Sequence, residues 1–162
     1  MNVLGRTSGV GLQGIDGEIV EVEADVATGL PGFLMGGLPD AACRQAAERV
    51  KSAVVHSGFD RLECKVVVNL SPASLPKSGT GFDLAIALAI LVARGDVAGG
   101  AMHGMVHIGE LGLDGSVRPV PGVMARVQGA VASGRKRVVV PLTGAAEAAL
   151  VGGAEVYAVA SL

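Results

Sequence analysis

A polar loop in the middle of the chain carries the side chains best suited to covalent catalysis. Residues 69–81 read NLSPASLPKSGTG and offer three serines beside one lysine, namely Ser71, Ser74, Ser78 and Lys77. A serine–lysine dyad needs a lysine that is removed from water, so that its pKa falls, and that lies within hydrogen-bond reach of the hydroxyl. We expect this polar loop to be hydrated, so nothing in the sequence desolvates the lysine. The alternative is an ordered loop whose hydroxyls cap the helix that begins near Phe82.

The same loop is superficially similar to a phosphate-binding loop. A P-loop has the order GxxxxGK[ST], in which the lysine follows the second glycine and begins a helix. Here Lys77 precedes both glycines, and no other window has that order or the order GxGxxG between a strand and a helix. We therefore expect no nucleotide cofactor within these residues.

Two histidines and a glutamate are the best candidates for metal ligands. His103 and His107 are four apart and Glu110 follows, a spacing that suits zinc on a helix. The glycines around them predict a loop that leads into a strand, where residues four apart lie about 13 Å from each other, too far to share one ion. Glu110 would point the other way. We expect exposed or hydrogen-bonded histidines and no metal site, and no cluster that would hold Mg²⁺ for insertion into a porphyrin.

The strands expected to position these groups come first in the chain. Residues 19–27 alternate between small apolar and acidic side chains, as a half-buried strand does, and residues 2–10 are expected to pair with them. Residues 33–36 predict a short third strand. The run of three valines at 66–68 has no alternation, which predicts a strand covered on both faces.

Helices and strands alternate in the remainder. Asp40 is the expected N-cap of a helix to about Ser57, and the almost wholly apolar segment 82–94 predicts a central buried helix. Asp114-Gly115 between two short strands (106–113 and 116–120) predicts a type I′ hairpin. The last elements are expected to be a helix after Pro121-Gly122, a covered strand at 137–140, a helix over 144–151 capped by Thr143, and a strand at 155–158. This order indicates an α/β (α+β) fold, a mixed sheet with packed helices, and disfavours a doubly wound nucleotide fold.

Length and composition set further bounds. The 162 residues are 50% hydrophobic, which predicts one folded domain over 1–162 and excludes disorder. The net charge of −2 argues against a basic nucleic-acid module, and four aromatic residues give little capacity for base stacking. Two cysteines without a CxxC spacing, no signal peptide and no apolar run long enough for a bilayer predict a cytoplasmic protein with reduced thiols and no membrane partner.

Five segments in order carry a family resemblance. They are TGLPGFLMGGLPDAA (28–42), ERVKSAVVHSGF (48–59), VVNLSPASLPKSGTGFDLAIALAIL (67–91), IGELGLDGSVRPVPGV (108–123) and GAAEAALVGGAEVYAV (144–159). Together they resemble the N-terminal domain of the ComM/YifB family, which is often called magnesium-chelatase-like. The resemblance implies a Lon-protease-like domain with the fold of domain two of ribosomal protein S-five. It also implies an AAA+ ATPase module after residue 162, which would bind ATP and Mg²⁺.

The kinship with Lon proteases allows a comparison of catalytic residues. Lon proteases read PKDGPSAG around the catalytic serine, where this chain reads PKSGTGFD, so the serine position falls on Gly81. The Lon lysine position, after the Asp114-Gly115 turn, falls on Met124. Neither glycine nor methionine can attack a carbonyl or carry a proton, so the resemblance implies no catalytic residue and no activity of this domain alone.

Two hypotheses follow for function. In the first, the chain is a non-catalytic interaction or assembly domain of a hexameric AAA+ motor that promotes branch migration of DNA during natural transformation. Its candidate contacts with DNA are basic residues near the C-terminus, whose alternative role is an ordinary solvated face: Arg118, Arg126, Arg135, Lys136 and Arg137. In the second, it is a divergent hydrolase in which Lys77 pairs with Ser74 or Ser78.

Overall fold

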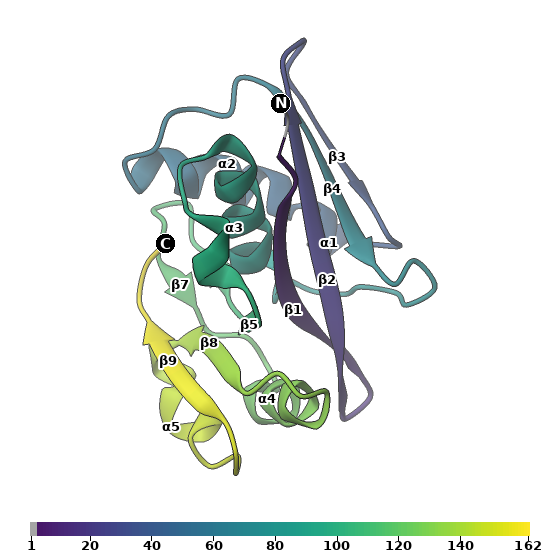
Figure 1. Ribbon diagram of the computed structural model, residues 1–162, viewed down its shortest axis with the longest axis vertical. Helices are drawn as coiled ribbons and strands as arrows, with labels where there is room; N and C mark the ends of the chain where they lie inside the picture. Colours follow the sequence, from purple (N-terminus) through teal and green to yellow (C-terminus); the bar gives the residue numbers. More distant parts are fainter. Residues whose placement is uncertain (1–2) are drawn as a thin grey trace.

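The computed structural model describes residues 3–162, and its strands lie in three sheets (Figure 1). The strands are β1 (Gly5–Gln13), β2 (Asp16–Ala27), β3 (Gly32–Gly36), β4 (Lys65–Ser71), β5 (Met105–His107), β6 (Glu110–Leu111), β7 (Val117–Arg118), β8 (Arg137–Pro141) and β9 (Glu155–Val159). The helices are α1 (Ala41–Arg44), α2 (Ala46–His56), α3 (Asp83–Arg94), α4 (Val123–Ala132) and α5 (Ala145–Ala148), with short 3₁₀ turns η1 (Gly99–Met102) and η2 (Leu142–Gly144). Asn2, which the sequence placed in the first strand, lies outside the described residues.

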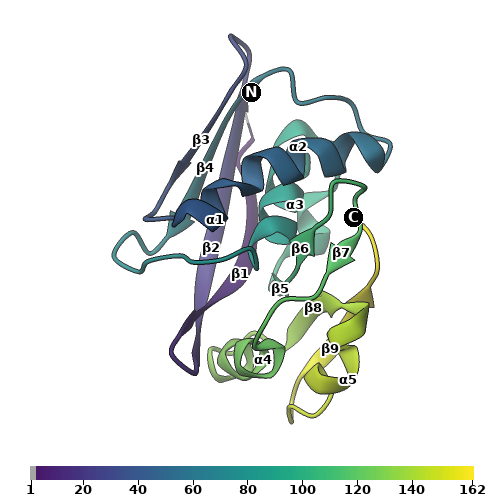
Figure 2. The same ribbon diagram turned by 180° about the vertical axis from the view of Figure 1, so that it is seen from behind.

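The largest sheet has the order β1-β2-β4-β3 and is mixed, as the sequence predicted. β1 and β4 both run antiparallel to β2, and β3 runs parallel to β4. Helices α2 and α3 cover one face of this sheet (Figures 1 and 2). The alternation of β2 follows from that arrangement, because its valines face the helices and its acids face away.

One strand prediction is wrong. The three valines of β4 do not lie in a strand covered on both faces, because burial alternates along it and Val67 is 37% exposed. β-branched residues favour a strand in general, but only contact with a second layer buries both faces. Here the helices cover one face alone.

The last three long strands form a separate parallel sheet, β5-β8-β9, in place of an extension of the first. Helices α4 and α5 pack on it, and α4 also contacts β1 and β2. The core therefore has two apolar clusters, one between the large sheet and α2 and α3, the other around α4, β5 and β8.

The hairpin β6–β7 also differs from its prediction. A type I′ turn needs positive φ at both central residues, but the one non-glycine residue with positive φ within 3–162 is Leu38. Three residues separate Gly112 from Ser116, whose backbones are hydrogen-bonded at 2.8 Å, and Gly115 has a φ of +87°. The turn is thus a three-residue loop with glycine in the left-handed position.

Two capping predictions are wrong and one is confirmed. Asp40 accepts a hydrogen bond from the amide of Cys43 at 2.7 Å, so it caps α1, and α2 follows directly. Neither α3 nor α5 has a side-chain cap, so the Ser and Thr hydroxyls of the loop do not cap α3, and Thr143 does not cap α5.

Candidate functional site

Gly81, which the motif comparison places at the position of the Lon serine, lies against a buried arginine. Gly81 is buried where the loop enters α3, and its carbonyl accepts a hydrogen bond from the amide of Gly109 at 3.3 Å. A Cβ atom at Gly81 would lie 2.9 Å from Nη1 and 3.3 Å from Nη2 of Arg126. The guanidinium of Arg126 therefore occupies the space that a side chain at Gly81 would need.

Arg126 comes from α4, two residues after Met124. Its Nε donates to the carbonyl of Pro121 at 3.0 Å and its Nη1 donates to the carbonyl of Val10 at 2.6 Å. The residue is 5% exposed, and burial lowers the pKa of its guanidinium. The charge is thus held by backbone carbonyl groups of β1 and of the segment before α4.

Met124, at the position of the Lon lysine, has an apolar environment. Its side chain is half-buried against the cluster around α4. Its amide donates to Oε1 of Glu147 at 3.2 Å, so that carboxylate satisfies a free N–H of the first turn of α4. No group at Gly81 or Met124 can act as nucleophile or base.

Lys77 is buried, which corrects the expectation of a hydrated lysine. Its side chain is 1% exposed, and burial lowers its pKa. Its Nζ donates to the carbonyl of Pro72 in the same loop. Within residues 3–162 no serine hydroxyl is hydrogen-bonded to it, and Ser74 and Ser78 are exposed. A serine–lysine dyad needs a hydrogen bond between the amine and a serine hydroxyl as well as a desolvated lysine. Lys77 has no such bond, so neither Ser74 nor Ser78 is activated as a nucleophile.

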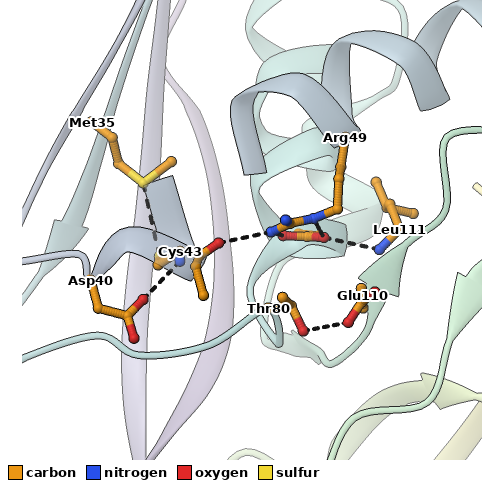
Figure 3. A network of polar contacts seen from close by, with 9 residues as sticks. Met35, Asp40, Cys43, Arg49, Thr80, Glu110 and Leu111 are labelled. Atoms are coloured by element: carbon orange, nitrogen blue, oxygen red, sulfur yellow. Dashed lines mark hydrogen bonds and ion pairs between the residues drawn. The ribbon is translucent and has the colours of Figure 1, made fainter. Parts of the chain in front are cut away.

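A polar network joins the loop to α2 and to the β6–β7 hairpin (Figure 3). Arg49 of α2 donates from Nε and Nη2 to both carboxylate oxygens of Asp83, at 2.6 and 2.9 Å. Asp83 also accepts from the amide of Leu111 at 3.1 Å, and Arg49 also donates to the carbonyl of Ala42 at 3.0 Å. The network fixes the start of α3 to two neighbouring elements.

The charges of this pair are matched. The hydrogen bond to Asp83 raises the pKa of Arg49, so the guanidinium stays charged. Burial raises the pKa of Asp83, and its bonds to Arg49 and Leu111 oppose that change. Beside the pair, Thr80 donates to Glu110 at 2.5 Å (Figure 3). The two segments that resemble Lon motifs therefore meet, but through a threonine and a glutamate and with no serine or lysine.

The cysteines are two free thiols, as predicted. Cys43 is buried, and its Sγ lies 3.9 Å from Sδ of Met35 (Figure 3). Burial, with smaller contributions from Asp40 and Asp83, raises the pKa of Cys43 to about 12, so the thiol is protonated and unreactive at neutral pH. Cys64 is half-buried.

The five basic candidates for DNA contact do not form one strip. Arg126 is buried and cannot contact the backbone of a DNA duplex, which corrects its assignment. Arg135 is paired with Glu21 at 2.6 Å and donates to Ser8. Arg118 is exposed on β7, whereas Lys136 and Arg137 are exposed at the start of β8. Only these last three remain as exposed candidates.

The histidine expectation is half right. His103 is exposed, but His107 is 2% exposed and its Nδ1 has no hydrogen-bond partner in residues 3–162. Burial lowers the pKa of His107 to about 4, so the ring is neutral. The part of the chain that the structure describes holds no group of three or more His, Cys, Asp or Glu placed to bind a metal ion. No helix in residues 3–162 is long and apolar enough to cross a bilayer.

Sequence reasoning missed the structural roles of both Arg49 and Arg126. It placed Arg126 on a surface facing DNA or solvent, and it gave Arg49 no role; arginine is in general mostly exposed. The available signal was helical spacing: Arg126 follows the buried Val123 by three residues, and Arg49 follows the buried Ala46 by three. Residues three apart share a helix face, so both arginines lie on the buried face of their helices.

Comparisons with known proteins agree with this geometry. A family model described as "Subunit ChlI of Mg-chelatase" matches residues 22–144. The match lies within this domain, so the likeness to the chelatase subunit is carried by these residues themselves. Such a match covers most of the chain.

Similar curated proteins identify the group within this family to which the chain is related. An uncharacterized protein of Mycobacterium tuberculosis is 44% identical over 98% of this chain and 32% of its own length. YifB of Escherichia coli is 39% identical over 78% of this chain and 25% of its own length. The competence protein ComM of Haemophilus influenzae is 34% identical over 89% of this chain and 28% of its own length. The chain spans about a third of the length of the curated relatives it matches.

A more distant similarity supports the fold. A Lon protease of Trichlorobacter lovleyi is 22% identical over 86% of this chain and 18% of its own length. This likeness fits a Lon-like α/β fold and extends to no activity. The family model and the relatives YifB and ComM show that this chain belongs to the Mg-chelatase ChlI-like family and, within it, to the ComM/YifB proteins.

Proposed function

We propose that this chain is a non-catalytic interaction and assembly domain of a ComM/YifB-like AAA+ ATPase that acts on DNA. One observation carries the non-catalytic part. At the position of the Lon serine stands Gly81, and the guanidinium of Arg126 lies where a serine side chain would begin. Covalent catalysis needs a nucleophile and a base in contact, and these positions hold neither.

The wider activity rests on the relatives. ComM of Haemophilus influenzae is named a competence protein, and this chain covers 28% of it. On this basis we propose that the whole protein also has an AAA+ module that binds ATP and Mg²⁺, and that it works as a homo-oligomer, a hexamer, in DNA recombination. Within that assembly the domain would contact its own AAA+ module, its neighbours or DNA.

DNA contact would rest on three exposed cations, Arg118, Lys136 and Arg137. Cations that contact phosphates release counterions, so the logarithm of the association constant falls linearly with the logarithm of salt concentration, with a slope of about −0.9 for each contact on duplex DNA. Three contacts would give a slope of about −2.7 by this rule. With so few aromatic residues, stacking on single strands would add little.

The test is a salt titration of DNA binding, followed by fluorescence anisotropy. In the Lys136→Ala, Arg137→Ala double variant we expect the slope to become shallower by about 1.8. Arg94→Ala is the matched control, because Arg94 is already paired with Asp96 at 2.9 Å. A slope near zero in the unmodified chain would remove DNA contact from this domain and leave assembly as its role.

The hydrolase alternative has one observation in its favour, the burial of Lys77. Its amine is hydrogen-bonded to the Pro72 carbonyl, which leaves no serine for it to activate. Cleavage of an ester reporter by the purified chain, lost on Lys77→Met, would establish that alternative.

A further inference from the structure

Arg126 is a buried cation whose charge nothing in the domain balances. Charged groups are buried almost only when paired, because moving an unpaired charge out of water costs several kcal/mol. No carboxylate of residues 3–162 lies within 4.0 Å of its guanidinium, and burial is the one cause that shifts its pKa. Pairing with a carboxylate explains why Arg49 is half-buried, but it does not explain the burial of Arg126.

Backbone carbonyls satisfy only part of the guanidinium. Of the five N–H groups of an arginine, the Nε–H and one on Nη1 donate to Pro121 and Val10. Nη2 has no hydrogen-bond partner among the described residues. Three N–H donors of a charged fork thus remain unused.

The unused end of the fork reaches the surface. His107 Nδ1 is the one fully buried side-chain nitrogen or oxygen without a partner in residues 3–162, so Nη2 of Arg126 keeps some contact with solvent. The residue as a whole is only 5% exposed. The guanidinium is therefore held by two carbonyls, and its free donors keep only a small contact with solvent.

Gly81 is a requirement of this arrangement. Any side chain there would lie 2.9 Å from Nη1 and displace the fork. The same substitution that removes the nucleophile of a Lon-like site thus admits a cation in its place. The cation is held on three sides, by β1, by the loop and by the segment before α4.

We propose that Arg126 is a receptor for a small oxyanion, a carboxylate or a phosphate group, which binds to the three unused N–H groups of its guanidinium beside Gly81. A guanidinium matches the oxygens of either group through parallel N–H···O bonds. The ligand supplies the missing counter-charge, so binding stabilises the folded state by mass action. The inference does not depend on the DNA activity proposed above.

The test is thermal unfolding of the chain in sodium phosphate, in sodium acetate and in sodium chloride of equal ionic strength. We expect a saturable rise of the unfolding midpoint in phosphate or acetate relative to chloride, and no such rise in Arg126→Met. The matched control is Arg135→Met, which removes an arginine already paired with Glu21 and should keep the rise. Comparison of the two salts identifies the preferred oxyanion.

Equal midpoints in all three salts, or a rise that persists in Arg126→Met, would overturn the proposal. Arg126→Met also distinguishes specific binding from general stabilisation by salts that are excluded from the protein surface. That general effect raises the unfolding midpoint of the unmodified chain and of Arg126→Met alike. Should Arg126→Met fail to fold, a phosphate and acetate titration of the unmodified chain followed by NMR decides the question. Saturable shifts of the Gly81 and Gly122 amides would support the site, and unmoved amides would refute it.

Discussion

Arg49, which is half-buried, and Arg126, which is buried, occupy similar places on their helices and have opposite surroundings. Both follow a buried small residue by three positions on an amphipathic helix, Arg49 on α2 and Arg126 on α4. Arg49 meets a carboxylate, that of Asp83, which is 1% exposed in its side chain. Arg126 meets two carbonyl oxygens, and a Cβ at Gly81 would lie 2.9 Å from its Nη1.

Arg49 has a carboxylate partner that neutralises its charge, whereas Arg126 has none among residues 3–162. Arg49 is neutralised within the domain by Asp83, and its hydrogen bonds join three elements. Arg126 keeps its charge and three of its donors. A buried arginine is therefore informative about function only when its counter-charge is also located.

Breaking the neutralised pair should have the largest effect. Arg49→Met leaves Asp83 as an uncompensated buried carboxylate, and we expect a loss of about 3–5 kcal/mol in the free energy of unfolding. Urea denaturation measures it. Lys51→Met, which breaks the exposed pair with Glu48, is the control and should change stability by less than about 1 kcal/mol. A loss of similar size in both variants would mean that the burial of the Arg49 pair has no energetic consequence.

His107 extends the comparison, because it is a buried basic group that stays neutral. Its pKa is about 4, below the ordinary value, so the unfolded chain binds the proton more tightly. The stabilisation is fully present above pH 6.5 and is lost as the pH falls toward 4. We expect a loss of about 2 kcal/mol from this group between pH 7 and pH 5.

The measurement is urea denaturation at both pH values for His107→Leu and for the control His103→Leu, whose histidine is exposed. The pH dependence should shrink in the first variant and persist in the second. An unchanged dependence in His107→Leu would assign acid sensitivity to other groups.

A serine at the Lon position should destabilise the fold and give no activity. Gly81→Ser forces its Cβ to within 2.9 Å of Arg126, and overpacking of this kind costs about 1–3 kcal/mol. Gly152→Ser is the control, since a Cβ there meets nothing within 4 Å. A double-mutant cycle with Arg126→Met should recover part of the loss, and strict additivity of the two changes would show that Arg126 is not what crowds position 81.

Removal of the free charge should have the smallest effect. Arg126→Met ends the desolvation of a cation but leaves the carbonyls of Val10 and Pro121 without a donor. These terms oppose each other, so we expect a change within about 1.5 kcal/mol, well below that of Arg49→Met. Equal losses for the two arginines in urea would remove the distinction drawn between them.

The sequence predicts much of the fold because its patterns are local. The alternation along β2 and the almost wholly apolar α3 each indicate one element and one buried face. The misassigned face of β4 and the separate β5-β8-β9 sheet depend on which layers pack together, which no local pattern records. The site is only half predictable for the same reason. Gly81 and Met124 are found by motif comparison, whereas Arg126 reaches Gly81 across 45 residues.

The absence of a reactive nucleophile near Gly81 is tested most directly by covalent labelling. The chain is incubated with a fluorophosphonate probe of reactive serines, digested and analysed by mass spectrometry over residues 71–81. We predict no labelled serine, as in a heat-denatured sample. Stoichiometric labelling of Ser71, Ser74 or Ser78 that disappears in Lys77→Met would contradict it and establish a hydrolase.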